Sequence, residues 1–309
     1  MKAARIHAYG DLSGVVIDDV PVPEVGPDEV LIRVTAASLN PLDLKLIGGG
    51  LDAHFSLAFP YALGTDLAGT VERAGPLAAR WRPGDAVIAR PDPVRGGAFA
   101  EFAVVPATQV AAAPVALPAA AAAGLPTTAG TAWQALFETA RLTAGQTVLV
   151  HAGAGGVGSA AVQLARVAGA RVVATASASK TELVRRLGAD QVIDYRSEDF
   201  TAAIRNVDVV LDTIGGEIQQ RSFAVLRPGG VLASIVSPPD EGLAKAHGVA
   251  AAFVFHRTDA TRFALAAALC DAGSLTVVVD RELPLTALGA ALDHLAAGHA
   301  CGKVLLRPA

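Results

Sequence analysis

Cysteine is almost absent from this sequence. The chain of 309 residues contains two, Cys270 and Cys301, which are too few to form the cysteine cluster of a structural zinc site. We interpret them as ordinary thiols of a reducing compartment rather than as a disulfide. The first ten residues alternate like a strand and show no apolar core with a cleavage site, so a signal peptide is not expected. These observations favour a cytoplasmic protein.

Charge of either sign is also scarce. Charged residues make up 17% of the chain, and the formal net charge is -4, whereas a nucleic-acid surface requires a basic excess. Hydrophobic residues reach 52%, but no uncharged run of large apolar residues approaches the ~20 positions of a membrane-spanning helix. The most apolar run contains Pro114, Pro118 and Gly124. We therefore expect neither a nucleic-acid partner nor a membrane span.

The first part of the chain reads as short strands separated by turns. Alternating segments such as Val30–Ala36, Ala68–Arg73 and Phe99–Val105 are bounded by glycine and proline. The turn signal 81–85 precedes a further strand, Ala86–Ala89. Closely spaced strands of this kind are typical of a compact β-barrel.

The pattern changes beyond Leu117. An alanine-rich helical stretch, Pro118–Glu138, leads into short apolar strands that alternate with helices. This rhythm predicts a parallel sheet covered on both faces. The expected strands of this sheet are Thr147–His151, Arg171–Ala174, Gln191–Ile193, Val207–Leu211 and Val231–Ile235, and the expected helices are Val157–Gly169 and Lys180–Leu187. Beyond Thr258 the sequence predicts a helix, a short strand, a second helix and a terminal strand, at Arg262–Asp271, Thr276–Val279, Leu285–Ala297 and Lys303–Leu306.

A glycine motif lies between the first of these strands and the helix that follows. Gly153, Gly155 and Gly158 fit the pattern G-x-G-x-x-G, and Gly156 and Val157 complete the turn. Glycine allows the sharp turn and lets backbone N–H groups approach a pyrophosphate, while the helix N-terminus adds unpaired donors and a favourable dipole. In this strand–turn–helix context the motif predicts a dinucleotide site.

The end of the second strand indicates which dinucleotide binds. NAD-specific units usually place an acidic residue there for the ribose hydroxyl, but this segment has Ser177, Ser179 and Lys180 and no acid. Hydroxyls and an ammonium suit the 2′-phosphate of NADPH. In the alternative interpretation the serines only cap the next helix and Lys180 is solvated.

An ordered series of motifs resembles the quinone oxidoreductase (zeta-crystallin-like) branch of the zinc-independent medium-chain dehydrogenase/reductase superfamily. The series covers nearly the whole chain, which makes it more specific than any one member. It comprises Ala36–Asp43, Pro60–Gly69, Pro83–Val87, Gly97–Glu101, Gly130–Trp133, the glycine motif, Leu187–Asp190, Asp212–Gly216 and Gly302–Val304.

The resemblance implies an α/β architecture in which a Rossmann domain with a doubly wound parallel sheet is inserted into a GroES-like β-barrel substrate domain. We place the barrel at residues 1–118, the NADPH-binding domain at 119–257 and the return to the barrel at 258–309. The resemblance also implies a homodimer formed through an edge strand at Ala251–Phe255, since an unpaired apolar edge is a liability.

Zinc-dependent relatives carry a cysteine at the position of Asn40 and a His-Glu pair at Thr65-Asp66. These ligands are absent here, so no metal is expected. Without a metal to activate an alcohol, we expect reduction of an already electrophilic carbonyl compound, which needs less activation. We predict an NADPH-dependent reductase of a quinone or an α,β-unsaturated carbonyl. The alternatives are an enoyl-thioester reductase and a non-catalytic nucleotide-binding module.

The resemblance assigns candidate catalytic residues at the start of a predicted helix. Asn40 would donate a hydrogen bond to the substrate oxygen, or it is a turn residue before Pro41. Asp43 would orient Asn40 or a water, or it only caps the helix. Lys45 would donate a proton or contact the carbonyl, or it is a solvated surface cation.

The resemblance also assigns residues around the cofactor. Thr131, Ile214 and Gly215 would lie beside the nicotinamide, with Ser237 and Phe255 completing its wall. The remaining two are Tyr195, expected by the adenine or the 2′-phosphate, and Lys303, expected at the cofactor phosphates. The alternative roles are helix capping for Thr131, an exposed loop aromatic for Tyr195, and a solvated strand end for Lys303.

Overall fold

The structure is a computed structural model that describes residues 1–308. Two compact units are found. Unit 1 comprises Met1–Thr127, Thr258–Gly273 and the described residues from Val277 onward, and unit 2 comprises Thr128–Arg257 with Ser274–Thr276. The first boundary therefore falls beyond residue 118, because helix α2 (Ala119–Ala122) packs against strands of unit 1.

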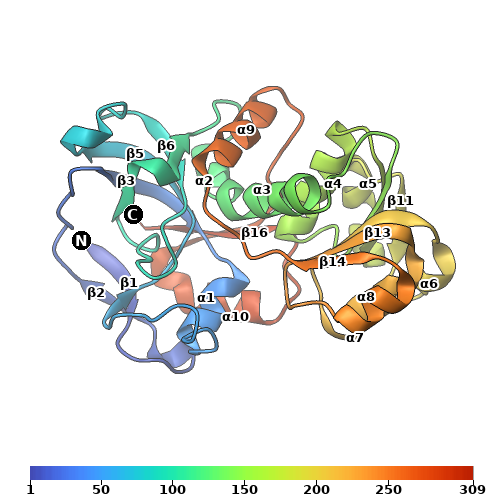
Figure 1. The fold of residues 1–309 in the computed structure, drawn as a ribbon. Helices are drawn as coiled ribbons and strands as arrows, with labels where there is room; N and C mark the ends of the chain where they lie inside the picture. The colour runs from blue at the N-terminus through green and yellow to red at the C-terminus, as the bar shows by residue number, and fades with distance from the viewer. Residues whose placement is uncertain (309) are drawn as a thin grey trace. The chain divides into compact units, whose positions relative to one another are not determined.

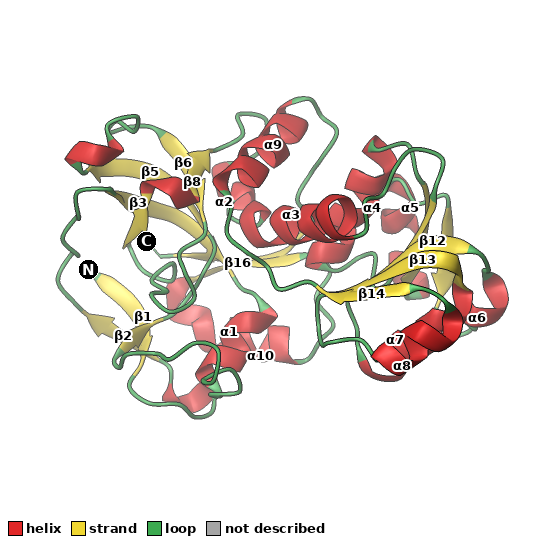
Figure 2. Cartoon of the chain, in the orientation of Figure 1, coloured by secondary structure: helices red, strands yellow, loops and turns green. Residues whose placement is uncertain are grey.

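Unit 1 is mainly β-sheet. Among the described residues its larger sheet has the order β15-β16-β3-β5-β6-β8, with β7 also paired to β3, and a smaller sheet has the order β2-β1-β4 (Figure 2). Its strands are β1 (Lys2–Ile6), β2 (Val16–Asp19), β3 (Glu29–Ser38), β4 (Tyr61–Ala62), β5 (Leu67–Ala74), β6 (Ala86–Ala89), β7 (Phe102–Pro106), β8 (Val110–Ala112), β15 (Val279–Pro284) and β16 (Lys303–Arg307), and its helices include α1 (Pro41–Ile47), α9 (Ala260–Asp271) and α10 (Leu288–Ala296).

The pairing of β16 with β3 positions the later site. The two strands are antiparallel, with Leu305 opposite Ser38, and the N–H of Leu39 donates to the carbonyl of Val304 at 2.9 Å. Alternate side chains of β3, such as Val30 and Ile32, are fully buried in the barrel core. Because a buried face specifies register, the start of β16 is held beside the segment that follows β3.

Unit 2 is a Rossmann domain. In the described part of the chain its parallel sheet has the order β11-β10-β9-β12-β13-β14, in which the first strand, β9, lies centrally beside the fourth, the order typical of dinucleotide-binding folds. Figure 1 shows α4 and α5 on one face and α6 to α8 on the other. The bounds are β9 (Thr147–Val150), β10 (Arg171–Ala176), β11 (Gln191–Asp194), β12 (Val207–Asp212), β13 (Leu226–Ser234), β14 (Ala250–Phe253), α3 (Leu125–Trp133), α4 (Gly156–Val167), α5 (Thr181–Leu187), α6 (Phe200–Ala203), α7 (Gly216–Ser222) and α8 (Glu241–His247).

Two predicted strands differ from the structure. The segment expected as a strand at Thr276–Val279 becomes β15 only at Val279, because the backbone N–H and C=O of Thr276 are both bound by the side-chain amide of Gln163, at 2.8 and 3.0 Å. The strand expected from Phe99 begins as β7 at Phe102, since the backbone of Phe99 pairs with Leu63 and Ala4 instead. Within residues 1–308, no helix combines the length and apolarity needed to cross a membrane.

Candidate active site and cofactor-binding region

Asn40 stands at the start of α1 in unit 1. Pro41, which lacks an N–H and has a fixed φ, is favoured in the first helical turn, so the helix begins at once. The carboxylate of Asp43 accepts a hydrogen bond from the backbone N–H of Asn40 at 2.7 Å, which is one half of a capping box. Asn40 is 3% exposed and Asp43 is fully buried.

The side-chain amide of Asn40 is held from two sides. Its Oδ1 accepts from Nζ of Lys303 at 2.7 Å, and its Nδ2 donates to Oδ2 of Asp66 at 2.9 Å. The same ammonium donates to the carbonyl of Leu39 at 2.5 Å and lies 3.8 Å from Oδ2 of Asp66. We refer to Asn40, Asp66 and Lys303 as the amide triad.

Asp66 connects this triad to the rest of unit 1. Its Oδ2 also accepts from the hydroxyl of Ser38 at 3.2 Å, and its Oδ1 accepts from the backbone N–H and hydroxyl of Thr127 at 3.1 and 2.8 Å. The guanidinium of Arg90 donates to the same Thr127 hydroxyl at 3.0 Å. A buried carboxylate is tolerated when it is hydrogen-bonded and accompanied by cations.

Burial shifts the protonation of this cluster. Desolvation raises the pKa of Asp43 to about 7, with the negative charge of Asp66 acting in the same direction. Desolvation also lowers the pKa of Lys303 and of Arg90, while Asp66 and Asp43 oppose that change. Two carboxyl groups therefore lie near two cations, and the net charge of the cluster depends on whether Asp43 is protonated.

A zinc ion does not fit these residues. Asn40 and Asp66 stand at two expected ligand positions, but their oxygens already accept from protein donors, and the ammonium of Lys303 lies among them. A divalent cation bound at this place would be repelled by the positive charge of that ammonium. Thr65, at the third position, is buried, and its hydroxyl has no hydrogen-bond partner within residues 1–308.

Lys45 is separated from the cluster. It is exposed on α1, whereas Asp43 is buried, because helix positions two residues apart do not face the same side. We therefore omit Lys45 from the catalytic group.

The glycine loop of unit 2 is closely packed. A Cβ atom on Gly158 would lie 2.1 Å from the carbonyl oxygen of Ala152, and one on Gly153 would lie 2.8 Å from Cβ of Ala174. Gly155 is the N-cap of α4, which begins at Gly156 and Val157. The first N–H groups of a helix have no intrahelical partner, so this cradle fits the pyrophosphate of a dinucleotide.

His151 supports this loop, a role that the sequence did not indicate. Its Nε2 contacts the hydroxyl of Ser222 at 2.9 Å, and its Nδ1 contacts the hydroxyl of Thr175 at 3.2 Å. The Thr175 hydroxyl in turn accepts from the N–H of Ala152 at 3.1 Å. Since Ser222 donates to the carbonyl of Ile218, it accepts from His151, which assigns the ring proton to Nε2. Burial lowers the pKa of His151 to about 4.

The expected 2′-phosphate residues follow neighbouring strands. Ser177 comes directly after β10, and Lys180 ends the short 3-10 helix that follows it. Tyr195 follows β11 and donates its N–H to the carbonyl of Ala176 at 3.2 Å. Tyr195 is 54% exposed, and the guanidinium of Arg196 lies over its ring at 5.7 Å from the centroid. Because carboxyl ends of parallel strands meet at one edge, the structure brings these residues together.

The expected nicotinamide residues follow β12 and β13. Oδ1 of Asp212 accepts from the N–H groups of Ile214 and Gly215 at 3.0 and 2.8 Å. The side-chain amide of Gln219 donates to Oδ2 of Asp212 at 3.0 Å and to the carbonyl of Ser237 at 3.1 Å. Gln219 therefore joins the two loops, and nothing in its sequence context indicated this role.

Thr131 and Phe255 are linked to the segment after β14. The hydroxyl of Thr131 contacts Nδ1 of His256 at 3.0 Å, and the carbonyl of Phe255 accepts from the amide of Gln134 at 3.0 Å. The ring of Phe255 is exposed. Within the protein, the ammonium of Lys303 is buried in the amide triad, where it donates to Leu39 and Asn40. Its expected contact with the cofactor phosphates stays a prediction.

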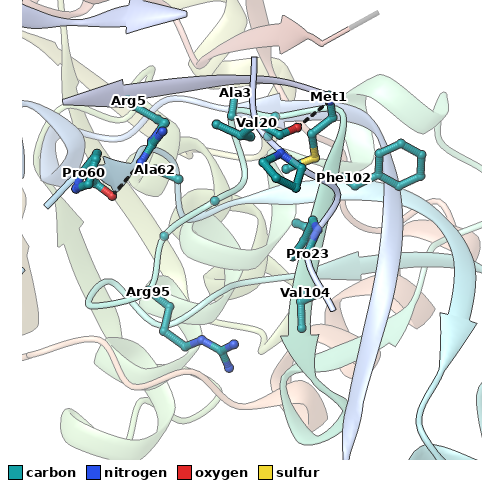
Figure 3. A pocket seen from close by; sticks show the side chains of 15 residues that line it. Met1, Ala3, Arg5, Val20, Pro23, Pro60, Ala62, Arg95, Phe102 and Val104 are labelled. Atoms are coloured by element: carbon teal, nitrogen blue, oxygen red, sulfur yellow. Dashed lines mark hydrogen bonds between the residues drawn. The ribbon is translucent and has the colours of Figure 1, made fainter. Parts of the chain in front are cut away.

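A hollow of about 370 Å³ lies elsewhere in unit 1 and is lined by Met1, Arg5, Pro23 and Arg95, among others (Figure 3). Arg5 forms an ion pair with Asp18, and Arg95 forms an ion pair with Glu29. None of the expected site residues lines this hollow, and we assign it no function.

Comparison with known proteins identifies the class of the chain. The family model described as alcohol dehydrogenase GroES-like domain matches residues 26–115, and the one described as zinc-binding dehydrogenase matches residues 187–306. The chloroplastic NADPH-dependent alkenal/one oxidoreductase of Arabidopsis thaliana is 36% identical over 99% of this chain and 80% of its own length.

A solved structure gives the same result. The quinone oxidoreductase of Coxiella burnetii superposes with a TM-score of 0.92 at 31% identity, covering 100% of this chain and 99% of that one. The chain is an oxidoreductase of the medium-chain dehydrogenase/reductase superfamily. Within that superfamily it belongs to the quinone oxidoreductase branch.

The comparison with curated relatives also shows that the expected cytoplasmic location is wrong. The mitochondrial NAD(P)H oxidoreductase RTN4IP1 of Danio rerio is 34% identical over 69% of this chain and 60% of its own length. That relative and the Arabidopsis protein are both named for organelles. A low cysteine content and the pattern of the first residues therefore did not identify the compartment.

Proposed function

We propose that the chain is an NADPH-dependent reductase that transfers a hydride to a quinone or an α,β-unsaturated carbonyl compound. One observation carries the proposal: the glycine loop, Ser177, Tyr195, Ile214 and Ser237 follow the carboxyl ends of strands in one Rossmann sheet. The names of the Arabidopsis and Coxiella proteins support the choice of acceptor. Bound NADPH would supply the hydride.

Asn40 is the proposed contact for the acceptor oxygen. Its Nδ2 has two protons; one is directed to Asp66, and the other has only a 3.5 Å contact with the carbonyl of Ser38, which is too long for a strong hydrogen bond. That proton can stabilise the negative charge that develops on the oxygen as the hydride arrives. A single preorganised donor of this kind contributes roughly 10²–10³-fold to turnover.

Consumption of reduced nicotinamide tests the function directly. The full chain is assayed with NADPH and, in parallel, 9,10-phenanthrenequinone, an alkyl vinyl ketone and crotonyl-CoA. Turnover of the quinone or the ketone is expected. Turnover of the thioester alone would identify an enoyl-thioester reductase, and turnover of none would identify a nucleotide-binding module.

Asn40→Ala is expected to lower turnover by about 10²-fold, because the oxygen loses its donor. NADPH affinity, measured by calorimetry, should change little because Asn40 is not among the residues expected to bind the cofactor. Wild-type turnover in this variant would remove Asn40 from the site.

Ser177 and Lys180 are proposed to select NADPH over NADH. Lys180→Glu places a negative charge where the 2′-phosphate would bind, so the dissociation constant for NADPH should rise at least ~10-fold more than that for NADH. Arg171→Glu is the matched control, since Arg171 is exposed at the opposite end of the same strand, β10. Equal loss for both cofactors in Lys180→Glu would contradict the assignment.

A homodimer formed through β14 is also proposed. This strand pairs with β13 and ends the sheet, and Phe253 is 39% exposed. A second copy would cover this apolar edge. Sedimentation of wild type and of a Phe253→Lys variant should show a dimer and a monomer, respectively, and a monomeric wild type would refute the proposal.

A further inference from the structure

Lys303 is buried more deeply than an ordinary strand-end lysine. It is 4% exposed, although it is the first residue of β16. Its ammonium donates to the carbonyl of Leu39 and to Oδ1 of Asn40, at 2.5 and 2.7 Å. Lysine is almost never fully buried unless it is paired, so its partners should explain its presence.

The partners of Asn40 determine which way its amide points. An ammonium has donors and no acceptor, so only Oδ1 can face Lys303. An ionised carboxylate has acceptors and no donor, so only Nδ2 can face Asp66. An amide that was flipped by 180° would place NH₂ against the ammonium and oxygen against the carboxylate. Both contacts would then be repulsive.

We propose that Lys303 is a positioning residue that orients the Asn40 amide so that its second Nδ2 proton is presented to the substrate oxygen. This inference rests on the proposed role of Asn40 in the reduction. The positive charge acts in the same direction: it withdraws electron density from Oδ1 and makes the N–H groups stronger donors, because hydrogen bonds in a chain polarise one another.

The location of β16 explains why this lysine can reach Asn40. The pairing of β16 with β3 holds the Leu39 backbone against Val304, and the Lys303 N–H donates to the carbonyl of Val278 at 2.8 Å. The backbone of Lys303 is therefore held by Val278, and its ammonium is held by Leu39 and Asn40. A side chain that is fixed at both ends meets the condition for a precise orientation.

Lys303→Met tests the inference, since methionine keeps the apolar stem and removes the donors. The expected result is a roughly 10–100-fold loss of turnover with an unchanged dissociation constant for NADPH. In an Asn40→Ala background the same change should cost less than about 2-fold, because there is no amide left to orient. Losses that multiply in the double variant, or weaker NADPH binding with normal turnover, would overturn the inference.

A charge-neutral pair separates orientation from stability. Lys303→Met alone leaves the buried Asp66 with one cation fewer, which can unfold the chain, whereas Lys303→Met with Asp66→Asn removes both charges. This pair should fold, as judged by circular dichroism, and should be less active than Asp66→Asn alone, which keeps Lys303. Equal turnover of the pair and of Asp66→Asn would show that Lys303 only balances charge.

The same series distinguishes this inference from the proposed function. If the wild-type chain reduces no quinone or enone, both fail. If the wild type is active and Asn40→Ala is impaired, full activity of Lys303→Met defeats the role of Lys303 alone.

Discussion

At the scale of single residues, burial decides the charge state of the groups around Asn40. Asp43 has one oxygen on the backbone N–H of Asn40, while its Oδ1 has no hydrogen-bond partner among residues 1–308. An ionised carboxylate with an unsatisfied oxygen in the interior is costly. This cost is the reason that its pKa is raised, and it makes the stability of unit 1 depend on pH.

Asp43→Asn should expose that dependence. Burial raises the pKa of the wild-type carboxyl from 3.8 to about 7. Its protonated form therefore stabilises the fold at low pH, and this contribution is lost as the pH rises through 7. Asparagine can still accept from the Asn40 N–H but does not titrate. Relative to wild type, the free energy of unfolding in urea should increase by about 2 kcal/mol between about pH 5 and pH 8. A difference that stays constant, or that shrinks with pH, would contradict the assignment.

At the scale of elements, the entry into α4 depends on close approach of two backbone segments. Gly158→Ala would place a Cβ 2.1 Å from the carbonyl oxygen of Ala152, so the helix must move away from the loop. NADPH affinity should fall by at least ~10-fold. Gly289→Ala in α10 is the control, because a Cβ there meets nothing within 4 Å, and it should stabilise the helix by roughly 0.5–1 kcal/mol. Unchanged NADPH binding in Gly158→Ala would show that the loop is not the cradle.

Local sequence patterns predicted most of these helices and strands. They could not predict the hydrogen bonds of polar side chains that connect residues far apart in the sequence. The glycine motif and the periodicity around it place β9 and α4 nearly as found, because both signals lie within a short window. The strand expected at Thr276 failed because Gln163, 113 residues away, binds its backbone. The contact between Lys303 and Asn40 spans 263 residues. Such a pairing is set by the register of β16 on β3, which composition and spacing do not reveal.

At the scale of the whole molecule, each unit contains a buried titratable group. As the pH falls, the two groups change the free energy of unfolding in opposite directions. In unit 1, Asp43 favours the folded state increasingly as the pH falls through 7. In unit 2, the pKa of His151 is lowered from 6.5 to about 4 by burial. The unfolded chain therefore binds the His151 proton more readily, and the stability that depends on a neutral His151 is lost as the pH falls from 6.5 towards 4.

Acid should therefore unfold unit 2 before unit 1. The loss from His151 alone approaches about 3 kcal/mol near pH 4, a large part of the stability of an ordinary domain.

The two tryptophans report the units separately, since Trp81 lies in unit 1 and Trp133 in unit 2. Fluorescence of Trp81→Phe should change at a higher pH than that of Trp133→Phe. His151→Gln, which cannot become charged, should flatten the dependence in unit 2 and leave that of unit 1 unaltered. Simultaneous transitions in both single-tryptophan variants, or an unaffected acid transition in His151→Gln, would refute the assignment of this pH dependence to His151.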